Sequence, residues 1–334
     1  MNKSVRSTVI LLSPFIAAWI ALFIGAFHVT PVGVLQILLS PFFPSLNLGD
    51  IPERAIILEI RLPRVILAAL VGIALSGSGA VLQAIFRNPL VDSFILGISA
   101  GAALGCALAV GFFPWLPVQV MAFSFGMAAV LFTYFVAKTQ GEISRLPLIL
   151  SGVIVSAFFT AMVSIVKFLV DPHKLQSIVF WLMGSFALSD WKLVFTAATG
   201  IFIGLVPVYL MRWRLNVLSL GEDEAKSLGV NVQRDRIMFI AASSLAVSVA
   251  VSVSGIIGWV GLMTPHLVRM LTGPDHKTLV PLSMAVGAAF MILSDTAARS
   301  LTTFDVPVGI ITAITGAPFF IFLMRRGGRE SWGA

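Results

Sequence analysis

Charged residues are unusually few in this sequence. Only 11% of the 334 residues are Asp, Glu, Lys or Arg, while 58% are hydrophobic, and the mean hydropathy is +1.00. A soluble domain carries about 25% charged residues, so this stock cannot cover a water-exposed surface. The composition therefore excludes a soluble fold and indicates an all-α integral membrane protein, in which each span needs about 20 apolar residues.

Residues that build metal and redox sites are almost missing. The chain has one cysteine, Cys106, and four histidines at scattered positions, so no intramolecular disulfide can form and no metal site is expected. The excess of 22 Lys and Arg over 15 Asp and Glu gives a net charge of +7. In a membrane protein such an excess reports orientation and not nucleic-acid binding, and we expect no nucleic-acid partner.

Nucleotide-binding motifs are also absent. Gly77-Ser78-Gly79 lacks the third glycine of a dinucleotide fingerprint and lies inside an apolar run. In the segment 221–227, Ala225 stands where a phosphate loop requires glycine before its lysine, and three carboxylates would repel a nucleotide. We expect this chain to bind no cofactor and to be no enzyme itself.

Charge-free gaps divide the chain into about ten predicted spans. Their centres fall near residues 18, 74, 102, 127, 157, 202, 245, 263, 287 and 315, and residues 174–190 are expected to form an interfacial helix. The first apolar run, about Thr8 to Phe27, is too long for the core of a signal peptide, and we interpret it as a retained span. Small residues four apart, such as Gly72, Ser76 and Ala80 or Gly97, Gly101 and Gly105, predict close helix packing.

The distribution of Lys and Arg predicts the topology. With an even number of spans and an inner N-terminus, 15 basic residues fall inside and 7 outside, in the direction that the positive-inside rule requires. The inner set is Lys3, Arg6, Arg87, Lys138, Arg145, Arg212, Arg214, Lys226, Arg234, Arg236, Arg269, Lys277, Arg325, Arg326 and Arg329. The outer set is Arg54, Arg61, Arg64, Lys167, Lys174, Lys192 and Arg299. Both termini are therefore predicted to be cytoplasmic.

The longest inner segment, 211–236, is predicted to hold a short amphipathic helix. Ser219-Leu-Gly-Glu222 has the form of a capping box, three acidic residues fall in the first turn, and Gly229 is placed to end the helix. Such a helix of about ten residues is either a capped surface loop or a docking element for a cytoplasmic partner.

Five segments in order carry a family resemblance. They are 219–229 (SLGEDEAKSLG), 60–64 (IRLPR), 86–101 (FRNPL followed by LGISAG), 258–269 (GWVGL followed by PHLVR) and 306–320 (VPVGI followed by TGAPFF). Together with ten spans they resemble the type II ABC importer permeases, which take up iron-siderophores, haem and cobalamin. The resemblance implies one transmembrane permease domain over 1–334, with 219–229 as its cytoplasmic coupling helix.

The resemblance also implies partners and a mechanism. It implies a homodimer in the inner membrane with the path between two copies, an ABC ATPase subunit (two copies) that binds ATP and Mg²⁺, and a periplasmic or extracellular substrate-binding protein. Substrate would cross by alternating access, driven through the coupling helix. The residues implied in coupling are Ser219, Leu220, Gly221, Glu222, Asp223, Glu224, Ala225, Lys226, Leu228 and Gly229.

Three arginines match family positions that face the binding protein. Arg61, Arg64 and Arg299 are expected on the outer surface, where a guanidinium can pair with carboxylates and steer association. Two ordinary explanations stay open. Arg299 can pair with Asp295 in its own helix, and Arg61 and Arg64 can extend along the helix toward the membrane interface.

The predicted fifth span carries the candidate path. Ser156, Thr160 and Ser164 recur every fourth residue with Lys167 three further on, and we expect a weakly polar path wall with an ammonium that attracts an anionic chelate. Helix packing by the hydroxyls and snorkelling by the lysine are the alternatives. By resemblance, the cytoplasmic gate involves five residues: Asn88, Pro89, Leu90, Ile143 and Ser144.

Two other classes of function remain to be weighed. An ion-coupled secondary transporter needs no ATPase and usually has a carboxylate near the middle of a span, and no predicted span has one. A membrane enzyme needs a catalytic constellation, and none is found. An ATP-driven, binding-protein-dependent importer of a metal chelate is therefore the leading prediction.

Overall fold

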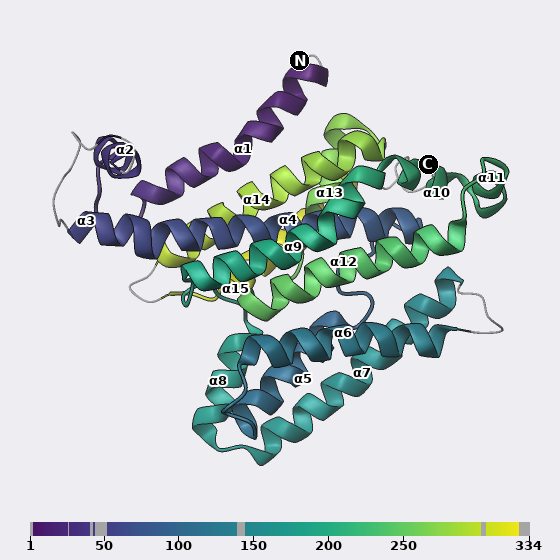
Figure 1. Ribbon diagram of the computed structural model, residues 1–334, viewed down its shortest axis with the longest axis horizontal. Coiled ribbons are helices and arrows are strands. Elements are labelled where there is room, and N and C mark those ends of the chain that lie inside the picture. Colours follow the sequence, from purple (N-terminus) through teal and green to yellow (C-terminus); the bar gives the residue numbers. More distant parts are fainter. Residues whose placement is uncertain are drawn as a thin grey trace.

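The computed structural model describes residues 3–25, 27–40, 43, 52–138, 144–301 and 305–326. Within these ranges the chain is helical, and the helices run nearly side by side in an elongated bundle (Figure 1). The expected all-α polytopic bundle is confirmed. Seven helices within these described ranges are long and apolar enough to cross a membrane.

Each of the ten predicted spans coincides with one helix. The seven long ones are α1 (Lys3–Phe23), α4 (Leu62–Phe86), α6 (Val118–Ala137), α7 (Arg145–Leu169), α9 (Trp191–Met211), α12 (Val232–Ser254) and α14 (His276–Ser300). The remaining three are α5 (Ile98–Gly111), α13 (Val260–Thr272) and α15 (Val308–Arg326). With 14 and 13 residues, α5 and α13 reach only about 20 Å, short of the hydrocarbon layer of about 30 Å.

Short helices occupy the two ends of the bundle. At one end lie α2 (Pro31–Leu39), α3 (Pro52–Ala55) and η2 (Ile56–Arg61), a π-helix that runs directly into α4. Between α7 and α9 lies α8 (Pro172–Leu182), within the segment expected at the interface. At the other end lie α10 (Trp213–Leu220) and α11 (Glu222–Ser227), which Figure 1 shows projecting beyond the long helices.

Side chains cap the helices where the sequence supplies an oxygen. Asp171, Asp190, Asn231 and Asp275 accept hydrogen bonds from the first backbone N–H groups of α8, α9, α12 and α14. These donors have no partner within their own helix. Such caps place the helix starts in loops, where the scarce polar residues of this chain are concentrated.

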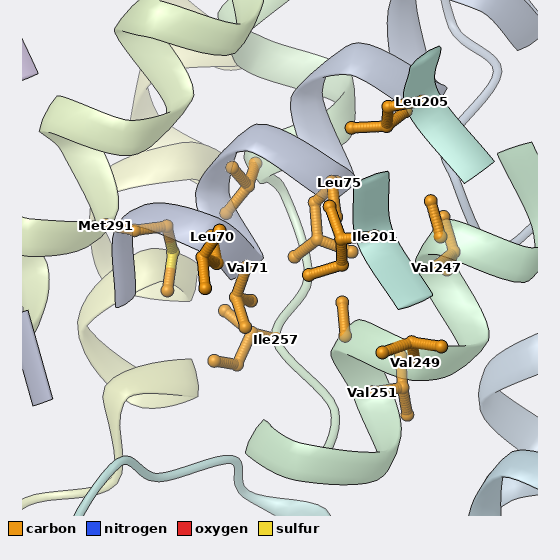
Figure 2. Packing of buried hydrophobic residues seen from close by; sticks show 14 of the residues in the cluster. Leu70, Val71, Leu75, Ile201, Leu205, Val247, Val249, Val251, Ile257 and Met291 are labelled. Atoms are coloured by element: carbon orange, nitrogen blue, oxygen red, sulfur yellow. The ribbon is translucent and has the colours of Figure 1, made fainter. Parts of the chain in front are cut away.

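Among the described residues, the two largest of four buried apolar clusters hold most of the bundle together. The larger joins α4, α9, α12 and α14, and Figure 2 shows Leu75 of α4 next to Ile201 of α9, with Val247 of α12 on the other side of the α9 ribbon. The smaller joins α5, α6, α7 and α8 around Phe159 and Ile178. Figure 1 shows this second group lying below the first, with α6 next to α12.

Small residues let the helix backbones touch, as the four-residue spacing predicts. A Cβ on Gly72 would lie 2.2 Å from the carbonyl oxygen of Gly287, between α4 and α14. On α5, a Cβ on Gly101 would lie 2.4 Å from the carbonyl oxygen of Phe125 on α6. Only glycine fits such contacts, so these positions set the spacing between neighbouring helices.

Two hydrogen bonds show at which end of the bundle α1 and α15 begin. Arg6 near the start of α1 donates to the carbonyl of Leu271, 3.4 Å away, at the end of α13. The first residues of α15 bond to the opposite end, where Val308 N donates to Gly184 O over 2.9 Å. The described end of α15 therefore points toward the same end of the bundle as α10, α11 and the start of α1.

Candidate functional site

The segment 219–229 consists of a helix end, a break and a six-residue helix. Gly221 is extended at φ 175° and separates α10 from α11, and the carboxylate of Glu224 folds back onto it, leaving no room for a Cβ. Ser219 Oγ donates to Leu215 O inside α10 over 2.8 Å. The predicted capping box and a single helix of ten residues are therefore wrong, because Ser219 lies inside the preceding helix, which ends at Leu220. Gly229, with φ +76°, follows the end of α11 as predicted.

Glu222 connects this segment to two long helices. Its Oε1 lies 2.5 Å from Arg236 Nη2 on α12 and 3.6 Å from Arg145 Nη2 at the start of α7. The hydrogen bond from Arg236 is the main cause that lowers the pKa of Glu222 below its ordinary value. The carboxylate is therefore ionised at neutral pH, and it ties α11 to α7 and α12 at once.

A second attachment joins the segment to the end of α4. Arg87, in the left-handed conformation at φ +49°, ends α4, and its Nη2 donates to the carbonyl of Leu218 on α10 over 2.8 Å. Arg87 directly precedes the predicted gate residues Asn88, Pro89 and Leu90, and Arg145 directly follows Ser144. Both predicted gate segments are therefore attached next to 219–229, the predicted coupling segment.

The gate residues themselves are exposed or half-buried. Asn88 Oδ1 accepts a hydrogen bond from Leu90 N over 2.9 Å and shapes the turn, while Pro89 is half-buried and Leu90 is exposed. Ser144 lies exposed just before α7, and Ile143 lies outside the described residues. Their role as a cytoplasmic gate stays a prediction.

The tip of the coupling segment presents an apolar and acidic surface. Leu220 and Leu228 are 62% and 61% exposed, and Asp223, Glu224 and Lys226 are also exposed. Ala225 is fully buried beneath them. Large apolar side chains exposed at the end of a membrane bundle are typical of a surface that contacts a partner.

The three outer arginines differ from expectation, because the structure buries them. Arg64 is 8% exposed and pairs with Asp295 of α14 and with Asp305, each over 2.9 Å. Arg61 is 4% exposed and donates to the carbonyls of Leu22 and Phe27. The expectation of exposed arginines on this face is therefore wrong for the single chain.

Arg299 forms the contact with Asp295 that was the alternative to a docking role. Its Nε lies 3.9 Å from Asp295 Oδ2, one turn earlier in α14, and it donates to the carbonyl of Ala21. A desolvated guanidinium needs a carboxylate or carbonyls close by, and this end of the bundle supplies both. The docking role of Arg61, Arg64 and Arg299 stays a prediction.

The polar positions of α7 divide between the bundle and its surface. Thr160 and Ser164 are exposed, and Ser164 Oγ donates to Thr160 O over 3.0 Å. Ser156 is half-buried and lies against Gly97, at the start of α5, and Lys167 is half-buried near the end of α7. The structure therefore places Thr160 and Ser164, but not Ser156, on an open face.

Sequence reasoning missed the partners that organise these sites. Arg145 and Arg236 around Glu222, and Asp295 and Asp305 around Arg64, were not grouped in advance. Asp305 is 241 positions from Arg64 in the chain, and no local periodicity connects such residues. Across the described residues, no three His, Cys, Asp or Glu side chains come close enough to hold a metal ion.

The chain is thus a bundle of long apolar helices with a helix pair projecting from one end, which is the architecture of a polytopic membrane protein. The chain belongs to the FecCD transport family, whose model matches residues 11–326. It is a permease subunit of an ABC transporter and not an enzyme, and the ATPase is a separate subunit.

Known relatives cover most of the chain. A Helicobacter pylori protein described as an iron chelatin transport system permease is 48% identical over 81% of this chain and 82% of its own length. The Haemophilus influenzae molybdate import system permease protein MolB is 43% identical over 94% of both chains. The Yersinia pestis hemin transport system permease protein HmuU is 37% identical over 80% of this chain and 83% of its own.

A solved structure shares the fold. It is described as an inward-facing conformation of a metal-chelate type ABC transporter, and it superposes with a TM-score of 0.85 at 38% identity. The match covers 96% of this chain and 99% of that one. The short helices α5 and α13 therefore belong to a known permease architecture.

Proposed function

We propose that this chain is the permease subunit of an ATP-driven, binding-protein-dependent importer of a metal chelate such as an iron-siderophore, haem or cobalamin. Residues 1–334 act as one permease domain, and two copies of it form the path. The observation that carries the proposal is the predicted coupling segment 219–229, which exposes Leu220 and Leu228 and is attached to α7 and α12 through Glu222 and, through the preceding Leu218, to the end of α4.

The contacts of Glu222 could transmit a movement of α11 to the long helices. An ATPase subunit that moves α11 also moves Glu222, and with it Arg236 of α12 and Arg145 of α7. Because α7 begins at Arg145, a displacement of α11 shifts a whole spanning helix as a rigid body. This mechanical link supports alternating access, with the gate at Asn88–Leu90 and Ser144.

The open face of α7 supports a path shared between two copies. Thr160 and Ser164 are exposed along one side of a helix that is otherwise apolar there, so a second copy would complete a weakly polar wall. Lys167, near the outer end, would attract an anionic chelate. Lys167→Ala should lower the uptake rate while leaving the amount of protein in the membrane unchanged.

Both membrane orientation and substrate belong to the proposal. The inner location of α10 and α11 rests on the Lys and Arg distribution, which also puts both termini in the cytoplasm of a cell whose inner membrane holds the chain. Relatives are named for iron chelatin, hemin and also molybdate. A metal chelate is favoured because the high-coverage structural match is described as metal-chelate type.

The decisive experiment uses the complex reconstituted in vesicles with its ATPase subunit. Loaded binding proteins carrying ferric siderophore, haem, cobalamin or molybdate are added in turn, and uptake and ATP hydrolysis are measured. A metal chelate should raise both rates, and Leu220→Arg with Leu228→Arg should abolish co-purification of the ATPase. Uptake driven by an ion gradient without ATP would contradict the proposal and favour a secondary transporter.

A further inference from the structure

An apolar groove of about 230 Å³ is lined by residues of α4, α9 and α14. Leu70 and Ile73 of α4 and Met284 of α14 line it together with Ile201, Phe202, Leu205, Val206 and Tyr209 of α9. No polar atom of the lining residues is exposed in the groove. The groove therefore suits a flexible apolar chain and offers nothing to a polar substrate.

The groove opens sideways from helices that are long enough to span a membrane. Each of α4, α9 and α14 meets the length and hydropathy of a span. Phe202 and Val206 on its rim are 60% and 46% exposed. Its mouth therefore faces the lipid phase, since water does not reach this depth of a bilayer.

One end of the groove carries positive charge. The guanidinium carbon of Arg212 lies 4.0 Å from the centroid of the Tyr209 ring, which lines the groove. Arg212 Nε donates to the carbonyl of Lys277 over 3.0 Å, so the two basic residues lie side by side. Among the described residues, Arg212 Nη2 donates to no acceptor, and the Lys277 side chain is exposed.

The nearby carboxylate of Asp275 offsets only part of this charge: it attracts the Lys277 ammonium, but most of its contacts are to other groups. Asp275 caps α14, and its oxygens accept hydrogen bonds from Asn216 Nδ2, Lys277 N and Thr278 Oγ1. Those contacts hold it toward the helix start and α10. Arg212 and Lys277 therefore remain available to a second anion.

The basic residues lie at one end of the apolar groove, as the charged headgroup of a phospholipid lies at one end of its acyl chains. Arg212 is six residues beyond Val206 on the α9 side, and Lys277 is seven residues before Met284 on α14. At 1.5 Å per residue both charges lie about 10 Å from the middle of the groove, toward the same end of the bundle. A phosphate bound by Arg212 and Lys277 would direct its acyl chain between α4, α9 and α14.

We propose that this groove is a binding site for one anionic phospholipid, with its phosphate on Arg212 and Lys277 and an acyl chain against Phe202, Val206 and Met284. A guanidinium binds phosphate oxygens through paired N–H donors. Apolar burial of the chain adds to this attraction, and a juxtamembrane basic residue also favours anionic lipid. The site is independent of which chelate is transported.

The test is lipid retention by the purified, assembled transporter. The complex is exchanged into mixed vesicles of palmitoyl-oleoyl phosphatidylglycerol and palmitoyl-oleoyl phosphatidylcholine, extracted in mild detergent and examined by native mass spectrometry. Bound phosphatidylglycerol should exceed phosphatidylcholine at equal supply. Arg212→Gln combined with Lys277→Gln should weaken phosphatidylglycerol retention on the order of tenfold, because two interfacial cations are lost.

Matched variants separate the site from general membrane contact. Val206→Trp should fill the groove and reduce retention with both charges intact. Lys192→Gln and Phe195→Trp change an exposed cation and an exposed aromatic residue on the same α9 outside the groove, and they should retain lipid like the unmodified complex. Equal retention of the two lipids, or equal loss in all four variants, would overturn the proposal. So would photocrosslinking of position 206 to another protein chain instead of lipid.

Discussion

Arg64 of α4 and Asp295 of α14 form a buried ion pair over 2.9 Å, and their side chains are only 10% and 2% exposed. Arg64 also reaches Asp305, which precedes α15, over 2.9 Å. One guanidinium therefore joins the starts or ends of three helices at the end of the bundle opposite α11. Removing one partner of such a pair leaves an unpaired buried charge.

Asp295→Leu should therefore destabilise the protein by about 3–5 kcal/mol, measured as unfolding in detergent by heat or denaturant. Asp305→Asn is the matched control, because the Asp305 side chain is 40% exposed and an exposed pair contributes at most about 1 kcal/mol. Arg64→Met combined with Asp295→Leu should recover part of the loss. Equal effects of the two single variants would show that burial does not set the strength of this network.

Glu222→Gln should uncouple ATP hydrolysis from uptake. The neutral amide cannot hold both Arg236 and Arg145, so α11 would move without α7. Uptake per ATP hydrolysed should fall several-fold, while the ATPase still co-purifies because Leu220 and Leu228 are unchanged.

Asp223→Asn is the control for that variant, since Asp223 is exposed on the same helix turn and forms no ion pair within the described residues. It should retain the normal ratio of uptake to hydrolysis. A Glu222→Gln complex with a normal ratio would remove Glu222 from the coupling route. Loss of ATPase binding in that variant would instead assign Glu222 to docking.

The pH dependence of the Glu222 contacts follows from the sign of its pKa shift. The pKa is lowered from 4.5 in the folded protein, mainly by the hydrogen bond from Arg236. The stabilisation is then present in full above pH 4.5 and is lost as the pH falls through the lower folded value. The Tm difference between the unmodified protein and Glu222→Gln should be constant from about pH 8 to about pH 5 and shrink below about pH 4. A difference that disappears near neutral pH would contradict this assignment.

Local sequence signals predicted the helices far better than the contacts between them. Apolar runs located all ten spans, and the spacing of Gly72 and Gly101 anticipated close helix contacts that the structure confirms. The same signals wrongly predicted that Arg61 and Arg64 are exposed. A basic residue beside an apolar run is equally compatible with an exposed side chain and with one buried against carbonyls. The buried state depends on Asp295 and Leu22, which lie far away in the chain. Likewise, the Ser219 hydroxyl does not cap α11 but donates to a carbonyl within α10, since the extended Gly221 divides the segment.

Gly72→Ala tests how far helix spacing depends on the absence of a side chain. The added Cβ would meet the carbonyl oxygen of Gly287 at 2.2 Å, and neither backbone can yield without moving a helix. Overpacking of this kind costs about 1–3 kcal/mol, so the Tm should fall. Gly258→Ala is the control, because its Cβ would meet nothing within 4 Å, and it should leave the Tm nearly unchanged. A neutral Gly72→Ala would mean that α4 and α14 separate easily.

Cross-linking tests whether the open face of α7 meets a second copy. Cys106 is buried and is replaced by serine, and Thr160→Cys then provides one thiol on the exposed face. Two copies that share a path should place these thiols close enough for a short bifunctional maleimide, and a covalent dimer should form in native membranes.

Phe195→Cys is the matched position for this test, since Phe195 is 67% exposed on α9, away from α7. It should remain monomeric under the same treatment, because the proposed dimer leaves α9 toward lipid. A dimer formed through position 195 and not through position 160 would move the interface to the other side of the bundle. The hydroxyls of Thr160 and Ser164 would then face lipid, where a helix can satisfy them only through its own carbonyls, as Ser164 does with Thr160.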